Sequence, residues 1–205
     1  EGVFQGLTLL AIVQGRILKS TEWVDNLIGN KLKEFDLKRY LTHRHNLRWL
    51  AEASPYSFVK FIQNDIKNGS VLLSQLMEVK HKKYSIIGSE IYYTELLFAL
   101  EAISWDEQYL FDTTDILMHL CSYPNDSSYS NQPINTLSHI YRFILPQTYA
   151  HFEYRLNVLK SLTVKHRKMV ANLCVIILKG LDDRVFQPNI HFRWRMREKK
   201  ESPRY

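Results

Sequence analysis

The sequence predicts an all-α protein, an irregular α-solenoid in which about nine or ten helices stack as antiparallel pairs. Apolar residues recur with helical spacing along almost the whole chain, clear stop signals separate them, and no convincing pair of strands remains. The sequence has only 7 Gly and 6 Pro in 205 residues, which argues against a turn-rich β-protein. No strict sequence period is present, so the array is not one of the well-marked repeats.

The first helices are delimited by polar caps and by glycines. An apolar helix is expected over 4–13, and Thr21 can cap a second helix that stops near Gly29. Asp36 can cap the next helix, which extends to about residue 50.

The dipeptide Ser54-Pro55 marks a sharp helix boundary. Pro55 disfavours a helical conformation at Ser54 and suits the first position of a new helix. The Ser54 hydroxyl can then accept a hydrogen bond from an exposed amide of the first turn. This helix is expected to end at Asn68-Gly69, and a short helix follows over 71–79.

The pattern of residues 91–120 predicts a helix, a tight joint and a second helix. The helix over 91–104 is apolar almost all round, so we expect it to be the most buried one. Asp106 is a good N-cap for the following helix. Trp105 precedes that cap and Leu110 lies four residues after it, which is the spacing of a hydrophobic staple.

Prolines and threonines delimit the last three helices. Pro133 begins a helix with clean apolar spacing from Leu137 to Leu145, and Pro146 is expected to end it. Thr148 can cap the next helix, and Thr163 can cap the last one, which stops at Gly180. A single array over 1–190 is therefore predicted, with 1–35 as a candidate looser N-terminal part.

Catalytic and metal-binding chemistry is not indicated by any motif, so we expect a protein that is not an enzyme and needs no cofactor. Glu95 and Glu101 are separated by roughly 120° around one helix and do not share a face. Glu101 is better explained as a carboxylate that binds a neighbouring helix's backbone or a cation. An alternative is an unrecognised enzyme that assembles Glu101, His139 and His151, which would require one pocket to hold all three.

The C-terminal segment 191–205 is a basic tail or the start of a following segment. Six basic and two acidic residues between 193 and 205 supply most of the formal net charge of +6, so the rest of the chain is near neutral. This distribution weakens the hypothesis that the whole domain binds nucleic acid. The tail itself alternates arginines with apolar residues, and it is the candidate interaction segment, comprising Arg193, Trp194, Arg195 and Arg197.

The cellular context is constrained only weakly. Two cysteines do not make a disulfide framework and weakly favour a reducing compartment. No uncharged apolar stretch of about 18 residues occurs, so no membrane span and a cytoplasmic location are expected. The chain begins with Glu1 rather than Met, which suggests a fragment of a longer protein.

Three stretches together resemble a helical region of large bacterial proteins with a STAND-type or AAA-like NTPase module. They are LRWLAEASPYSFVKFI (47–62), TELLFALEAISWDEQYLFDTTDILMHL (94–120) and NQPINTLSHIYRFILPQTYAHFEYRLNVLKSL (131–162). The family pattern often reads L-A-E-A-S-P, L-L-W-A-L-E-x-L-A-W and N-R-P-x-x-S-L. Here Phe98 replaces a tryptophan, Ser104 an alanine and Gln132 an arginine.

The resemblance implies a C-terminal helical scaffold or sensor attached to an upstream nucleotide-dependent module, in proteins that look like antiphage defence or stress-sensing machines. Its partner would be another protein or the upstream domains of the same chain. The matched residues are mainly residues of helix joints, and the expected structural joints are Ser54, Pro55, Glu101, Trp105, Asp106, Leu110, Pro133 and Pro146. The alternative function is a nucleic-acid-binding helical module that uses the C-terminal arginines and tryptophan.

Overall fold

The computed structural model describes residues 2–13, 20–78, 92–124 and 131–180. These residues form ten α-helices and one short 3-10 helix and contain no strand, which confirms the predicted all-α class. The chain divides into two compact units, residues 1–99 with 123–125 and residues 100–122 with 126–205. The solenoid stack, the single array over 1–190 and the looser part over 1–35 stay predictions.

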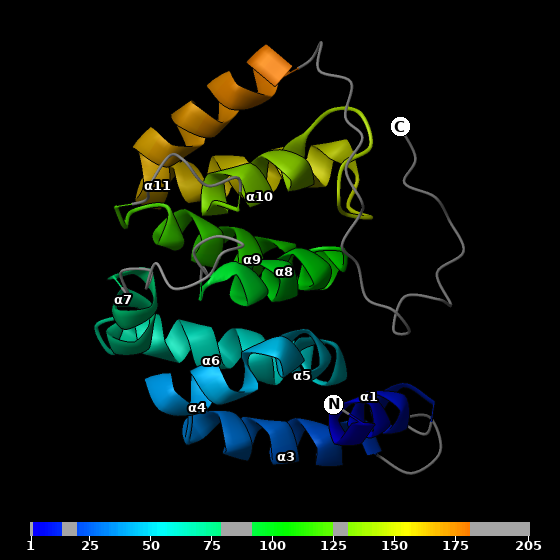
Figure 1. Ribbon diagram of the computed structural model, residues 1–205. Helices are drawn as coiled ribbons and strands as arrows, with labels where there is room; N and C mark the ends of the chain where they lie inside the picture. Colours follow the sequence, from blue (N-terminus) through cyan, green and yellow to red (C-terminus); the bar gives the residue numbers. More distant parts are fainter. Residues whose placement is uncertain (1, 14–19, 79–91, 125–130, 181–205) are drawn as a thin grey trace, which may run out of the picture. The chain divides into compact units, whose positions relative to one another are not determined.

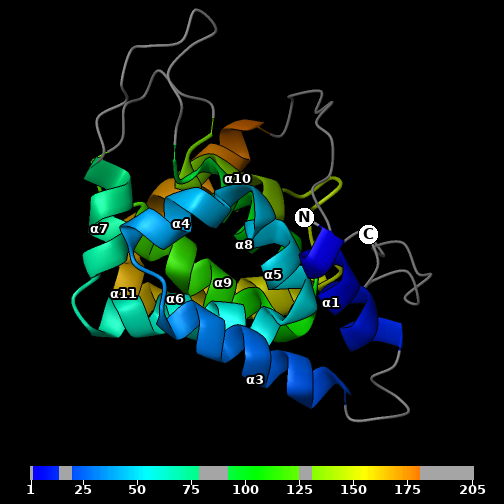
Figure 2. The same cartoon turned by 60° about the horizontal axis from the view of Figure 1, so that its bottom comes forward.

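The first unit is built from short helices, most of which pack against more than one other helix (Figure 1). Helix α1 contacts both α3 and α5, α6 contacts α3, α5 and α7, and α4 contacts α7. Figure 2 shows α3 lying along α6. The bounds are α1 (Gly2–Val13), α3 (Ser20–Lys33), α4 (Leu37–His43), η1 (Arg44–Asn46), α5 (Leu47–Ala53), α6 (Pro55–Lys67) and α7 (Val71–Glu78).

The core of this unit follows the helical spacing of the sequence. Val24, Ile28 and Leu32 lie four residues apart on α3 and are buried. Phe58 and Ile62 of α6 have the same spacing and are also buried. Apart from the buried Ser20 at the start of α3, the polar residues of both helices are half-buried or exposed.

Helix α3 does not stop at Gly29, and this prediction is wrong. The helix continues for four more residues to Lys33, with Gly29 in its interior. A Cβ atom at Gly29 would lie 3.4 Å from the Ser57 Oγ on α6, so the glycine marks a close approach of two helices. Gly69, by contrast, has a φ of 92° after the end of α6, a conformation that favours glycine.

Helix α8 (Thr94–Ile103) is shorter than the predicted 91–104 but is as buried as expected. All its residues from Leu96 to Ile103 are buried except Phe98, which is half-buried. Asp106 is the N-cap of α9 (Glu107–Leu120), where its carboxylate accepts from the Gln108 N–H at 3.1 Å.

The second unit contains α9, α10 (Pro133–Tyr141) and α11 (Phe152–Lys179), which contact one another pairwise. Pro133 occupies the first turn of α10, but the helix ends at Tyr141, and Pro146 lies in the segment before α11. The predicted continuation to Leu145 is therefore wrong. The backbone leaves the helix at Arg142, where ψ is 152°, and Leu145 before the proline has a φ of 51°.

Helix α11 replaces the two helices predicted after Thr148 and Thr163. It begins at Phe152, and Thr163 lies inside it with its hydroxyl donating to the Leu159 carbonyl. A kink occurs three residues later at His166, where φ is −126° and ψ is 37°, and the ribbon changes direction (Figure 1). The predicted boundary thus corresponds to a bend within one helix.

One carboxylate of α9, that of Asp115, binds two residues at the kink of α11. The Asp115 carboxylate lies 2.7 Å from His166 Nε2 and accepts from the Lys165 ammonium at 2.8 Å. Burial opposes ionisation of Asp115, but these hydrogen bonds outweigh it and hold the pKa of the carboxyl below its usual value.

Candidate functional site

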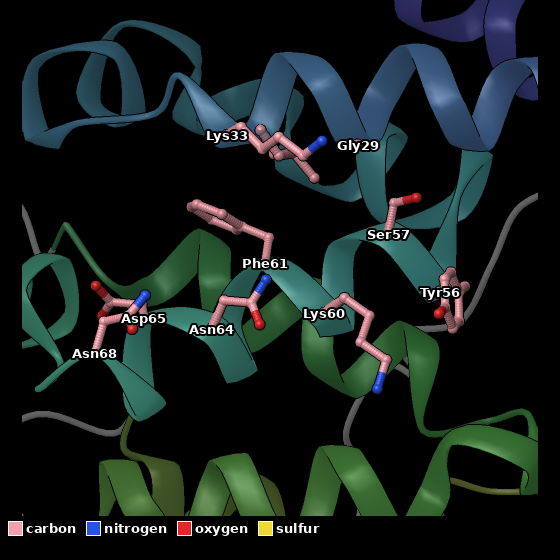
Figure 3. A pocket seen from close by; sticks show the side chains of 10 residues that line it. Gly29, Lys33, Tyr56, Ser57, Lys60, Phe61, Asn64, Asp65 and Asn68 are labelled. Atoms are coloured by element: carbon pink, nitrogen blue, oxygen red, sulfur yellow. The ribbon is translucent and has the colours of Figure 1, made fainter.

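A groove between α3 and α6 is the candidate binding site of the first unit (Figure 3). Its volume is about 380 Å³, near the lower end of the range for small-ligand pockets. Helix α3 contributes one wall, α6 contributes the other, and Asn68 follows at the end of α6. The lining residues are Gly29, Leu32, Lys33, Tyr56, Ser57, Lys60, Phe61, Asn64, Asp65 and Asn68.

Helical spacing brings the lining residues to one side of each helix. Tyr56, Lys60 and Asn64 lie four residues apart on α6, and Gly29 and Lys33 have the same separation on α3. Figure 3 shows Lys33 on the α3 wall and Lys60 on the α6 wall. The groove therefore presents cationic side chains from two separate helices.

Hydrogen bonds at one end of the groove hold the two walls together. The Ser57 hydroxyl donates to the Asp25 carbonyl of α3 at 2.9 Å. The Ser54 hydroxyl donates to the Asp25 carboxylate and also accepts from the Ser57 N–H at 3.3 Å, so it is the N-cap of α6. Ser54, the predicted joint residue, thus fixes the helix that supplies most of the groove lining.

The lysines of the groove bind only neutral amides in the described hydrogen bonds. Lys33 donates to the Asn30 side-chain carbonyl at 3.1 Å, and Lys60 donates to that of Gln63 at 3.3 Å. Lys60 also lies 5.7 Å from the centre of the Tyr56 ring, a cation–π distance. Each ammonium has three protons, so both can donate to a further acceptor.

The one carboxylate that lines the groove is already engaged. Asp65 accepts from the backbone N–H groups of Leu72 and Leu73, both at 3.0 Å. These bonds hold the carboxylate at the start of α7. The side chains that remain to recognise a ligand carry two positive charges, the Asn64 amide and the rings of Tyr56 and Phe61.

The predicted joint residues around Trp105 lie in the second unit. Trp105 is buried, and its ring packs edge-on against Tyr149 at 4.9 Å between centroids. Its carbonyl accepts from the Tyr149 N–H at 3.2 Å, and Leu110 is also fully buried. These contacts join the start of α9 to the segment before α11.

Glu101 is 4 % exposed, and it interacts electrostatically with Arg142. Burial lowers the pKa of Arg142, and the Glu101 carboxylate raises it. Burial and the Arg142 charge lower the pKa of His139, whereas His151 is exposed at the N-terminus of α11. No described group of His, Cys, Asp and Glu side chains has a geometry that could hold a metal ion.

The interaction residues predicted in the tail, Arg193, Trp194, Arg195 and Arg197, lie outside the described residues. Sequence reasoning missed the lysines of the groove, although one signal was present. Phe58 and Ile62 define the buried face of α6, which leaves Tyr56 and Lys60 together on another face. Lys33 could not be paired with them while α3 was expected to stop at Gly29.

Comparisons with known proteins leave the function open. Along the described residues, none of the helices combines the length and apolar character needed to cross a membrane. No protein-family model, curated protein or solved structure matches the chain. The resemblance to bacterial NTPase-linked proteins therefore stays a prediction that rests on the three quoted stretches.

Proposed function

We propose that this chain is a non-catalytic helical recognition domain whose groove between α3 and α6 binds an acidic segment of a protein partner. The observation that carries the proposal is the placement of Lys33 and Lys60 on separate walls of one groove. The one carboxylate of the lining, Asp65, accepts from two backbone N–H groups, and the lining keeps one net positive charge. Carboxylates of a bound segment would supply the missing negative charge.

The remaining lining residues suit a peptide. Tyr56 and Phe61 present aromatic surface, and the Asn64 amide can both donate and accept. A volume of about 380 Å³ accommodates a few side chains rather than a folded domain. We therefore expect a short segment in which acidic residues flank an apolar one.

We also propose that this domain belongs to a larger protein. The resemblance of 47–62, 94–120 and 131–162 supports a scaffold or sensor role within a larger, cytoplasmic, bacterial NTPase-linked protein, including one that acts in antiphage defence. The acidic segment would then belong to an upstream domain of the same protein or to a separate partner. The reading frame that encodes the chain tests this setting, because it should also encode an NTPase module.

Binding of labelled peptides by fluorescence anisotropy tests the groove. A short peptide that alternates glutamate with leucine should bind, and a peptide that alternates lysine with leucine should not. Because the groove lysines are exposed, the affinity should fall as salt is raised. Equal binding of the two peptides would show that charge does not select the ligand and would overturn the proposal.

The same assay addresses the nucleic-acid hypothesis. A labelled single-stranded oligonucleotide is titrated against the whole chain and against a chain that lacks 191–205, at several salt concentrations. Tight, salt-sensitive binding that disappears with the tail would favour the nucleic-acid function over the groove. Absence of binding to both chains would exclude it.

A further inference from the structure

The part of α11 that follows the kink at His166, residues 167–179, is apolar on two opposite faces, and we call it the distal arm. Nine of the ten residues from Met169 to Leu178 are apolar. Val170 and Leu173 form the buried face of the arm. A helix that is apolar all round is normally covered all round, so the other face of the arm calls for a partner.

The exposed face of the distal arm has a continuous apolar stripe. Its four residues follow the spacing i, i+3, i+4 and i+7, and all are exposed: Ala171, Cys174, Val175 and Leu178. At about 100° per residue, this stripe lies roughly opposite the buried Leu173. Figure 1 shows the distal arm, coloured orange, at the edge of the second unit. The same spacing is the one by which a helix packs its apolar side chains against a partner.

Positive charges flank the stripe. Arg167 and Lys168 lie one turn before it, and Lys179 follows its last residue. All three are exposed and take part in none of the described ion pairs. Residues 154–179 of the sequence include six basic side chains and no acidic one. A surface that is apolar along its centre and cationic along its edges is complementary to an apolar surface with anionic edges.

Other occupants fit this surface less well. A second copy of the chain would bring the basic residues of two arms together, and like charges along a helix pair repel. Residues 181–205 of the same chain contain seven basic and four acidic residues, so they are repelled as well. Helices that bind a bilayer carry large and aromatic apolar residues, whereas this stripe is about two turns long and has no aromatic residue. Its small and β-branched side chains instead let another helix approach closely.

We propose that the distal arm binds a helix of a protein partner whose apolar seam is flanked by acidic side chains. The two helices would lie side by side, with the seam against Val175 and Leu178. The acidic side chains would pair with Arg167, Lys168 and Lys179 at the exposed edges, where salt screens such pairs. The arm belongs to the second unit and the groove between α3 and α6 to the first, so the two sites are made of different residues.

Binding of a labelled peptide to the whole chain, measured by fluorescence anisotropy under reducing conditions, tests this surface. The probe is a three-heptad peptide with leucines at the seam and glutamates at the flanking positions, and the control peptide has lysines at the flanks. The acidic probe should bind at least about tenfold more tightly than the control, and its affinity should fall as salt is raised. Absence of binding, or equal binding of the two peptides, would overturn the proposal.

Paired substitutions locate the peptide on the arm. Val175 is 47 % and Leu178 is 59 % exposed, so Val175→Gln/Leu178→Gln should weaken binding at least about tenfold while far-UV circular dichroism is unchanged. The matched control, Leu9→Gln/Val71→Gln, removes the same residue types from exposed positions of the first unit and should bind like the unmodified chain. An equal loss in both variants would contradict the proposal.

Charge substitutions separate the arm from the groove. Arg167→Gln/Lys168→Gln/Lys179→Gln changes exposed side chains alone and should weaken binding at least about fivefold, even if the apolar variant does not fold. Lys33→Ala/Lys60→Ala should bind the acidic probe in full. Loss of binding in the groove variant, with the arm variant unaffected, would place the peptide in the groove and refute the proposal.

Two further measurements test the other occupants. Sedimentation velocity of the unmodified chain should show no dimer that Val175→Gln/Leu178→Gln dissociates. Cosedimentation with phosphatidylserine–phosphatidylcholine vesicles should show no binding that this variant loses. A dimer or a vesicle complex that depends on these two residues would assign the stripe to a second copy or to a membrane, and either result would overturn the proposal.

Discussion

Replacing Trp105 by alanine should destabilise the protein more than any single surface change. The side chain is 4 % exposed, so truncation removes nearly all its buried apolar surface and leaves a cavity. Such a change costs about 3–5 kcal/mol in a well-packed core. The edge-on contact with Tyr149 accounts for about 0.5–1.5 kcal/mol of this.

Urea unfolding followed by far-UV circular dichroism measures the loss of free energy of unfolding. The matched control is Trp23→Ala, because Trp23 is 55 % exposed and its truncation should change stability by less than about 0.5 kcal/mol. A double-mutant cycle with Tyr149→Ala should return a coupling of about 0.5–1.5 kcal/mol. If Trp105→Ala lost no more stability than Trp23→Ala, the role of Trp105 as a packed joint between α9 and the segment before α11 would be wrong.

Three further changes test local features of the fold. Ser54→Ala removes the N-cap of α6 and should lower the free energy of unfolding by about 1 kcal/mol in urea titrations; an unchanged midpoint would contradict the cap. The pKa of Asp115 is lowered in the folded state, so its stabilising contribution is present above the pKa of the unfolded chain and is lost as pH falls through the folded pKa. Asp115→Asn should therefore be less stable than the unmodified protein at pH 7 and approach it in acid; a constant difference would refute the linkage. Burial raises the pKa of Cys121 to about 12, whereas Cys174 is exposed, so iodoacetamide at pH 8 should label Cys174 first in the folded protein, as read by mass spectrometry. Equal labelling rates would contradict the partial burial of Cys121.

Three helix starts were predictable from the sequence because capping is local chemistry, whereas Thr21 and Thr163, also predicted as caps, lie inside α3 and α11. Asp36, Ser54 and Asp106 each accept a hydrogen bond from an amide two or three residues later, as their position before a helical segment predicts. The burial of Leu96–Ile103 was predictable as well, since an apolar surface on nearly all sides of a helix has to be covered.

The end of α10 was not predictable from apolar spacing, which continues unbroken to Leu145. The helix ends at Tyr141, and hydrogen bonds outside the helical pattern hold the segment that follows. The Arg155 guanidinium donates a hydrogen bond to the Arg142 carbonyl, and the Gln147 N–H donates one to the His139 carbonyl. These contacts turn Ile144 and its neighbours out to the surface, against their apolar character.

The groove could not be predicted for a related reason. Its lysines lie 27 positions apart in the sequence and meet only because α3 packs along α6. Gly29 reads locally as a helix stop, yet in the structure it is the small residue that lets Ser57 approach. Packing between α3 and α6 therefore outweighs the low helix propensity of Gly29, as is common for isolated glycines.

The central claim is that Lys33 and Lys60 make the groove a site for an acidic segment. The most direct measurement compares the affinity of the alternating glutamate–leucine peptide for Lys33→Ala/Lys60→Ala and for Lys31→Ala/Lys38→Ala, which removes the same charge from exposed positions that do not line the groove. The groove variant should bind about 5- to 30-fold more weakly than the unmodified protein, since each exposed ion pair contributes up to about 1 kcal/mol. The control variant should bind almost as well as the unmodified protein, and an equal loss in both variants would contradict the account.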